Sequence, residues 1–335
     1  MKKNSNTLTF STLIQDFFCQ RLIQQQNVSQ RNVSSYRDTF RLLLNYLTRV
    51  RRKKLDTLTI SDLDAPIVTA FLQHLEKQRG NAIRTRNARF AAIRSFMKYA
   101  ALREPTALSV TQRVLALPMK RFPRAAIRYL SREEMSAILN ASDGSNWSSK
   151  RDRMLFALLY NTGARVSELI SLRRSDLSLD SSRSVHLMGK GRKERIVPLW
   201  KSTAKALREW LKQISPVSDA WVFPNRNGQA LSRSGVEKRL KVAVLRAADN
   251  CKSLKSKQPS PHTFRHTTAM HLLQAGVDIT VIALWLGHES IETTHLYIEA
   301  NLAMKNQALS KLEDIPARQP RFRPDDTLLR FLDDL

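Results

Sequence analysis

"TFRHTTAMHLLQAGVDITVIALWLGHESIETTHLYIEA", residues 263–300, contains four of the chain's seven histidines, together with Arg265 and Tyr297. His262 directly precedes this stretch. Three kinds of site would explain so much imidazole: a metal centre, ordinary histidines on a helix surface, or acid-base chemistry on a phosphate group. The rest of the sequence separates these hypotheses.

The spacing of the histidines supports a metal site only weakly. His262 and His266 are one helical turn apart, and His288 and His295 are two turns apart. A zinc site built on such pairs requires an HExxH motif or further cysteine or carboxylate ligands, and neither accompanies them. We therefore expect no metal ion and no other cofactor.

The charge of the chain indicates a polyanionic partner. Its 335 residues include 56 Lys or Arg and 29 Asp or Glu, a formal net charge of +27, which favours nucleic acid. A membrane surface is the rival partner, but no apolar run approaches the roughly 18 residues of a spanning helix. The N-terminus also lacks the apolar core of a signal peptide. The sequence predicts a cytoplasmic protein that binds nucleic acid and no membrane.

The length allows two domains, and the cysteines do not constrain them. Cys19 and Cys251 are far apart and form no CxxC pair. Neither a disulfide framework nor a cysteine-rich zinc site is expected.

The N-terminal third is predicted to be helical. Apolar residues recur there at three- and four-residue steps, which place them on one face of a helix. The segments with this pattern are 9–23, 33–50, 67–78 and 84–102.

The same region carries most of the excess positive charge. Residues 1–128 contain 24 Lys or Arg against seven Asp or Glu. Arginines that recur along its last helical segment form either an ordinary solvated face or a surface that contacts phosphates. The nearby "RVRRKK", residues 49–54, favours the second interpretation. The arginines predicted to bind DNA are Arg84, Arg86, Arg89 and Arg94.

A domain boundary is predicted at a basic stretch interrupted by proline. Pro118 and Pro123 break helix on both sides of it, and Ser131 with Glu134 forms a capping box that opens a new helix. The expected order is a helical domain at 1–117, a linker at 118–127, a second domain at 128–315 and a tail at 316–335.

The second domain is predicted to be mainly helical with a small β-sheet. Residues 184–200, "SVHLMGKGRKERIVPLW", alternate apolar and polar side chains on both sides of Gly189 and Gly191, which indicates a hairpin with Lys190 at its tip. "GKGRK" is not a nucleotide-binding loop, because the full GxxxxGK[ST] pattern is absent.

A glycine turn precedes another candidate residue. In "LLYNTGARVSELISLRRSDL", residues 158–177, one helix is expected to end at 161–163 and another to begin directly. Arg165 then lies in the first turn of the new helix, among free amides that suit an anion.

Transfer of a DNA phosphodiester without metal would assign a role to each candidate. Two permanently charged arginines, Arg165 and Arg265, could clamp the nonbridging oxygens of the phosphate. The phenol of Tyr297 could attack and form a phosphotyrosyl ester. Lys190 could protonate the departing 5′ oxygen, while His262 and His288 could accept the phenol proton.

Four motifs occur in one order along about 140 residues: "TGARVSEL" at 162–169, "GKGRKERIVPL" at 189–199, "HTFRHTTA" at 262–269 and "LGHESIETTHLY" at 286–297. With these motifs the chain resembles the tyrosine recombinases, the family of phage-type integrases and Xer-type resolvases. The resemblance implies a helical N-terminal core-binding domain and a tyrosine-recombinase catalytic domain that clamp DNA together. It also implies self-association on DNA, as a tetramer in the synaptic complex, with accessory or partner recombinases.

The resemblance implies the same catalytic residues: Arg165, Lys190, His262, Arg265, His288 and Tyr297. Supporting roles near the site or within helices are expected for Glu168, Asp176 and His266. Ordinary structural or surface positions are expected for the remaining histidines, which match no motif position: His74, His186, His271 and His295.

The expected activity is site-specific recombination of the integrase or transposase type, through a 3′-phosphotyrosyl intermediate and without metal or ATP. Chromosome-dimer resolution of the Xer type, relaxation of supercoils by a type IB topoisomerase, and an inactive DNA-binding regulator are the alternatives. The tail after Leu312 favours a mobile-element enzyme. Residues 325–335 form an acidic, amphipathic segment that we expect to clasp a neighbouring protomer, in addition to an exchanged helix at 301–312. A solvated tail that only aids solubility is the alternative for residues 325–335.

Overall fold

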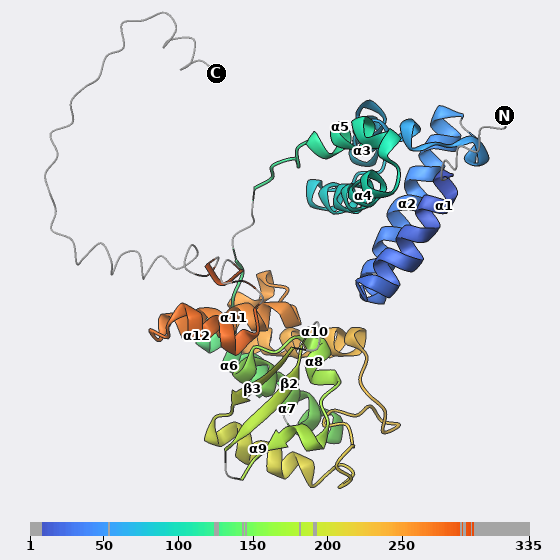
Figure 1. Cartoon of the computed structure of the whole chain (residues 1–335). Helices are drawn as coiled ribbons and strands as arrows, with labels where there is room; N and C mark the ends of the chain where they lie inside the picture. The colour runs from blue at the N-terminus through green and yellow to red at the C-terminus, as the bar shows by residue number, and fades with distance from the viewer. Residues whose placement is uncertain are drawn as a thin grey trace, which may run out of the picture. The chain divides into compact units, whose positions relative to one another are not determined.

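The computed structural model describes residues 9–52, 54–123, 127–142, 144, 146–180, 182–189, 193–288, 290, 293–295 and 297. Contacts between residues divide the chain into two compact units, Met1–Arg124 and Ala125–Leu335 (Figure 1). The outer limits of the domains expected from the sequence stay a prediction. Lys190 at the expected hairpin tip and the whole tail, with its expected exchanged helix and clasp, lie outside the described residues.

The first unit is helical, and all four helical segments predicted for it are confirmed. The expected helix at 9–23 differs in its second half, which is a π-helix; Phe17 and Leu22 are both buried there, and their five-residue spacing suits that period. The elements are α1 (Phe10–Asp16), η1 (Phe17–Gln25), α2 (Gln30–Arg51), η2 (Leu55–Thr57), η3 (Ile60–Leu63), α3 (Ala65–Lys77), α4 (Ile83–Arg103), η4 (Pro105–Ala107) and α5 (Leu108–Ala116).

Helix α4 organises the core of this unit. It contacts α1, α2, α3 and α5 (Figure 1), because its buried residues recur at three- and four-residue steps. Phe96 of α4 packs edge-on against Phe10, Phe17 and Phe40, with ring centroids 5.2–5.9 Å apart. Such edge-to-face pairs add to the free energy gained by burying the rings.

The second unit combines helices with a three-stranded antiparallel sheet of order β1-β2-β3. The predicted fold class, mainly α with a small sheet in this part of the chain, is confirmed. The elements are α6 (Arg132–Asn140), α7 (Trp147–Thr162), α8 (Val166–Ile170), η5 (Arg174–Asp176), β1 (Leu177–Ser178), β2 (Ser184–Met188), β3 (Glu194–Pro198), α9 (Lys201–Leu211), α10 (Arg233–Asn250), η7 (Lys252–Ser256), α11 (Pro261–Gln274) and α12 (Ile279–Leu286).

Two local predictions for this unit are confirmed. Ser131 and Glu134 form the capping box that opens α6, and β2 pairs with β3 as the expected hairpin. The hairpin is anchored on both sides, because α8 contacts β2 and α12 contacts β3 (Figure 1). The end of the hairpin next to its turn lies beside Arg165, at the start of α8, and Gly287, at the end of α12.

None of the helices in the described part of the chain is both long and apolar enough to cross a membrane.

Candidate active site

Arg165 lies at the turn between α7 and α8. Gly163 ends α7 in the left-handed conformation, with φ 60°, and Arg165 is the N-cap of α8. Arg165 therefore precedes the first turn of the helix, whereas the sequence predicts that it lies within that turn. Glu168 accepts hydrogen bonds from the backbone N and from Nη1 of Arg165, both at 2.8 Å. These bonds fix the guanidinium, whose side chain stays 35% exposed.

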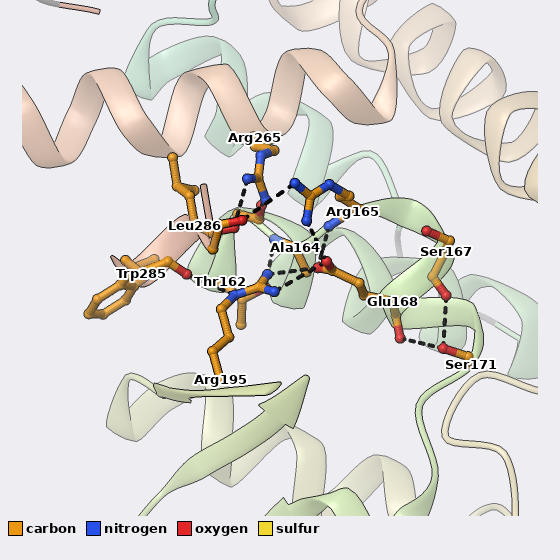
Figure 2. Close-up of polar contacts among 12 residues, drawn as sticks. Thr162, Ala164, Arg165, Ser167, Glu168, Ser171, Arg195, Arg265, Trp285 and Leu286 are labelled. Atoms are coloured by element: carbon orange, nitrogen blue, oxygen red, sulfur yellow. Dashed lines mark hydrogen bonds and ion pairs between the residues drawn. The ribbon is translucent and has the colours of Figure 1, made fainter. Parts of the chain in front are cut away.

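Glu168 is a buried carboxylate that a second arginine also contacts. Arg195 of β3 donates from Nη2 to Oε2 at 2.7 Å and from Nη1 to Oε1 at 3.2 Å (Figure 2). Burial alone would raise the pKa of Glu168, but the hydrogen bonds and charge of Arg195, together with the bonds from Arg165, lower it below its ordinary value. Glu168 therefore remains ionised and holds the two guanidinium groups on either side of it.

Arg265 is almost fully buried in α11. Its Nη1 donates to the carbonyl of Gly163 at 2.9 Å, and its Nη2 donates to the carbonyl of Leu286 at 2.7 Å (Figure 2). Burial, and then the charge of Arg165, lower the pKa of Arg265 to about 10. The group therefore keeps its positive charge at neutral pH.

The three arginines converge on the end of α12. The carbonyls of residues 285, 286 and 287 accept hydrogen bonds from Arg195 at 3.0 Å, Arg265 at 2.7 Å and Arg165 at 3.5 Å, respectively. Carbonyls in the last turn of a helix have no partner within the helix, and cations there interact favourably with the helix dipole. The segment that leads into His288 is thus tied to α8, α11 and β3 together.

The end of the hairpin next to its turn lies against this cluster. Gly189 donates its N–H to the carbonyl of Lys193 at 2.7 Å, and a Cβ at Gly189 would lie 3.3 Å from Oε1 of Glu168 and 3.7 Å from Nη1 of Arg165. Gly189, which directly precedes Lys190 in the chain, is therefore adjacent to Arg165.

Tyr297 is buried, and its hydroxyl lies 3.0 Å from Nδ1 of His266. The ring of His288 stacks on the phenol ring, with centroids 6.2 Å apart and an interplanar angle of 10°. Burial raises the pKa of Tyr297, and the charge of Arg265 opposes that increase. The phenol is therefore protonated at neutral pH and needs a proton acceptor before it can attack.

The histidines of the site differ in their surroundings. His262 is exposed, and its ring contacts that of His266 edge-on at 4.3 Å between centroids. His288 pairs its Nδ1 with the hydroxyl of Thr294 at 2.7 Å. Burial lowers the pKa of His288 to about 4, and the charges of Arg265 and Arg165 add to the effect. Outside the site, His271 pairs with Tyr160 at 2.7 Å.

Of the six residues predicted to be catalytic, the structure brings Arg165, Arg265, His288 and Tyr297 together, with His262 beside His266. Lys190 lies outside the described residues. Asp176, expected to support the site or a helix, accepts a hydrogen bond from the N–H of Arg173 at the start of η5, at 2.7 Å.

Sequence reasoning assigned no role to Arg195, although a signal for it existed. Val185 and Leu187 of β2 are buried, and in the ladder they face Val197 and Arg195 of β3. Arg195 therefore lies in phase with the apolar face of a strand, where an arginine needs partners. No comparable signal distinguishes His266 from its neighbours.

The four arginines of α4 have different surroundings. Arg84 is exposed, whereas Arg86 lies 3.3 Å from Glu76 in an ion pair. Arg94 donates to the carbonyls of residues 115 and 117 at 2.7 and 2.9 Å, which stabilises the end of α5. Burial lowers the pKa of Arg89. Contacts of these four residues with DNA stay a prediction.

Residues 128–304 match the phage integrase family, and residues 15–104 match the N-terminal SAM-like domain of phage integrases. The chain belongs to the phage integrase family. It is 46% identical to the putative integrase/recombinase y4rC of Sinorhizobium fredii, over 98% of both chains. It is 38% identical to the tyrosine recombinase XerD of Halalkalibacterium halodurans, over 68% of this chain and 74% of the relative.

The fold is also shared with a solved structure. The Tn1549 transposon integrase in complex with transposon right end DNA superposes with a TM-score of 0.70 at 16% identity, over 90% of this chain and 99% of that one. The predicted family and the predicted enzyme class, a tyrosine-type site-specific recombinase, are confirmed.

Gly163→Ala should destabilise the second unit by about 3 kcal/mol. The left-handed backbone costs a non-glycine residue about 1–2 kcal/mol, and overpacking adds about 1–3 kcal/mol, since the new Cβ would overlap Cδ2 of Leu286. Urea unfolding measures the loss. Gly228→Ala is the matched control, because Gly228 also has a positive φ of 76° but no atom within 4 Å of its Cβ position. Equal losses in both variants would show that the contact with Leu286 has no cost.

Proposed function

We propose that this chain breaks and rejoins DNA strands at specific sites through a 3′-phosphotyrosyl intermediate, without metal or ATP. The observation that carries the proposal is the convergence of Arg165 and Arg265 at the end of α12, beside His288 and the buried Tyr297. Two guanidinium groups next to a phenol can hold a phosphodiester while the hydroxyl attacks it.

The proposed roles follow the chemistry of each group. Arg165 and Arg265 neutralise the nonbridging oxygens, whose charge rises as the phosphorane forms. Tyr297 forms the ester with the 3′ phosphate, and Lys190 protonates the 5′ oxygen that leaves. His262 and His288 assist proton transfer and orient the phosphate.

The proposed biological reaction is integration or transposition of a mobile element. The similarity to y4rC, whose name is putative integrase/recombinase, covers 98% of this chain, and the fold is shared with a transposon integrase. Resolution of chromosome dimers remains the alternative, because XerD proteins are also relatives.

The proposed substrate is double-stranded DNA, bound by the charge of the chain and by the arginines of α4. We propose that protomers assemble as a tetramer in the synaptic complex, with accessory or partner recombinases, and that the protein acts on DNA of the cytoplasmic nucleoid. The C-terminal segment 301–335 is proposed to link neighbouring protomers.

Covalent trapping on DNA tests this function. Fragments of host DNA that carry a nick downstream of the cleaved bond should retain the protein covalently, and sequencing them should recover one recurrent site. Two plasmids that contain this site should then recombine, in the presence of EDTA as well as without it. Relaxation of random supercoiled plasmid without recombination would instead indicate a topoisomerase, and DNA binding without any adduct would indicate a regulator.

A further inference from the structure

His266 contacts the hydroxyl of the proposed nucleophile directly. Its Nδ1 lies 3.0 Å from Oη of Tyr297, and the two rings meet edge to face with centroids 5.6 Å apart. This distance is that of an ordinary hydrogen bond, and it is within the reach required of a general base. The sequence had assigned His266 only a supporting role.

The position of His266 is set by a well-fixed helix. A capping box between Ser260 and Thr263 starts α11, with Pro261 in its first turn. The neighbouring residue, Arg265, is bonded to two carbonyls from other parts of the unit. The imidazole is therefore held where it is before any DNA binds, as preorganised catalysis requires.

The imidazole of His266 is neutral at neutral pH. Burial lowers its pKa to about 4, and the charges of His262 and Arg265 act in the same direction. Two further titratable groups of the described residues lie beside it: Tyr297 and, stacked on the phenol, His288. A neutral imidazole with Nδ1 facing a protonated phenol accepts the phenol's hydrogen bond and carries its own hydrogen on Nε2.

The other two histidines of the site are placed differently. His288 directs its Nδ1 to Thr294 and lies parallel to the phenol ring. His262 contacts the ring of His266 from the exposed side of α11. Of the three imidazoles, His266 is the one hydrogen-bonded to the phenolic oxygen.

We propose that His266 is the base that removes the proton of Tyr297 during DNA cleavage, an inference that rests on the proposed function. The Oη–H bond breaks and its proton moves to Nδ1 of His266, while Oη forms the new bond to phosphorus. The bond from phosphorus to the 5′ oxygen breaks, and that oxygen takes a proton from Lys190, the proposed acid. In rejoining, His266 returns its proton to the departing phenolate.

The test measures single-turnover cleavage of a nicked duplex that carries the site recovered by trapping. His266→Gln keeps a hydrogen-bonding group near the phenol but cannot take its proton, so cleavage should fall by about 10²–10⁴-fold. Placing a fluorinated tyrosine at 297, whose phenol is more acidic, should shrink this loss to about 10-fold or less, because an acidic phenol needs a base less. A purely structural role would not respond to the acidity of the phenol.

A matched pair of residues provides the control. His271 pairs with Tyr160 through the same atoms, Nδ1 and Oη, at 2.7 Å, so His271→Gln should leave cleavage unchanged. His266→Asn is the second variant if His266→Gln does not fold. Parental cleavage in a folded His266 variant, or a loss that fluorination does not reduce, would overturn the proposal. Failure of the parent itself to form an adduct would instead contradict the proposed function.

Discussion

Tyr297→Phe should abolish the covalent protein–DNA adduct while leaving DNA binding close to that of the parent. The substitution removes only the phenolic oxygen, which the proposed reaction requires as nucleophile. The ring stays buried against His288, so the packing around it should be maintained. Denaturing gels of a nicked duplex measure the adduct, and gel-shift titration measures the affinity.

Tyr160→Phe is the control for this experiment. Tyr160 is half-buried and, like Tyr297, hydrogen-bonded to a histidine of α11, but that histidine is His271, nearer the C-terminal end of the helix. Loss of this hydroxyl should cost a hydrogen bond, about 0.5–1.5 kcal/mol of stability, and leave adduct formation intact. An adduct that persists in Tyr297→Phe would point to a different nucleophile.

Local patterns in the sequence predicted much of the fold. The helices of the first unit, the capping box of α6 and the β2–β3 hairpin depend on residues close together in the chain, so spacing and turn chemistry were sufficient. The π-helical second half of the segment at 9–23 was missed, because an i,i+5 bond pattern has no strong local signature.

Spacing alone could not assign the partners of the arginines. Arg84 and Arg94 occur in one helical segment and were assigned one role, yet Arg94 bonds to carbonyls 21 and 23 residues away. Arg195 contacts Glu168, which is 27 residues away in the sequence, and His266 contacts Tyr297, which is 31 residues away. Contacts at such separations are created by tertiary folding. The strand pattern places Arg195 on the buried face of β3, but it does not reveal that Glu168 is its partner.

The charges of the described cluster suit a transition state better than a ground state. Arg165, Arg195 and Arg265 surround the single carboxylate of Glu168, which leaves two positive charges in excess among these four groups. A phosphodiester carries one negative charge, whereas the phosphorane formed by attack carries two. A group of charges that matches the doubly charged phosphorane more closely than the singly charged phosphodiester accelerates the reaction.

Arg265→Ala should therefore lower cleavage of an ordinary phosphodiester by about 10³-fold, the size of effect expected when a preorganised charge-stabilising group is removed. A methylphosphonate at the cleaved bond lacks one charged oxygen, so its transition state gains less from Arg265. With this substrate, the Arg265→Ala variant should recover most of the lost cleavage rate. Single-turnover cleavage of both substrates measures this difference. Arg174→Ala is the control, because Arg174 also donates to a carbonyl, that of Leu211, away from the cluster. An equal loss on both substrates would mean that Arg265 acts only by joining the carbonyls of Gly163 and Leu286, and not through its charge.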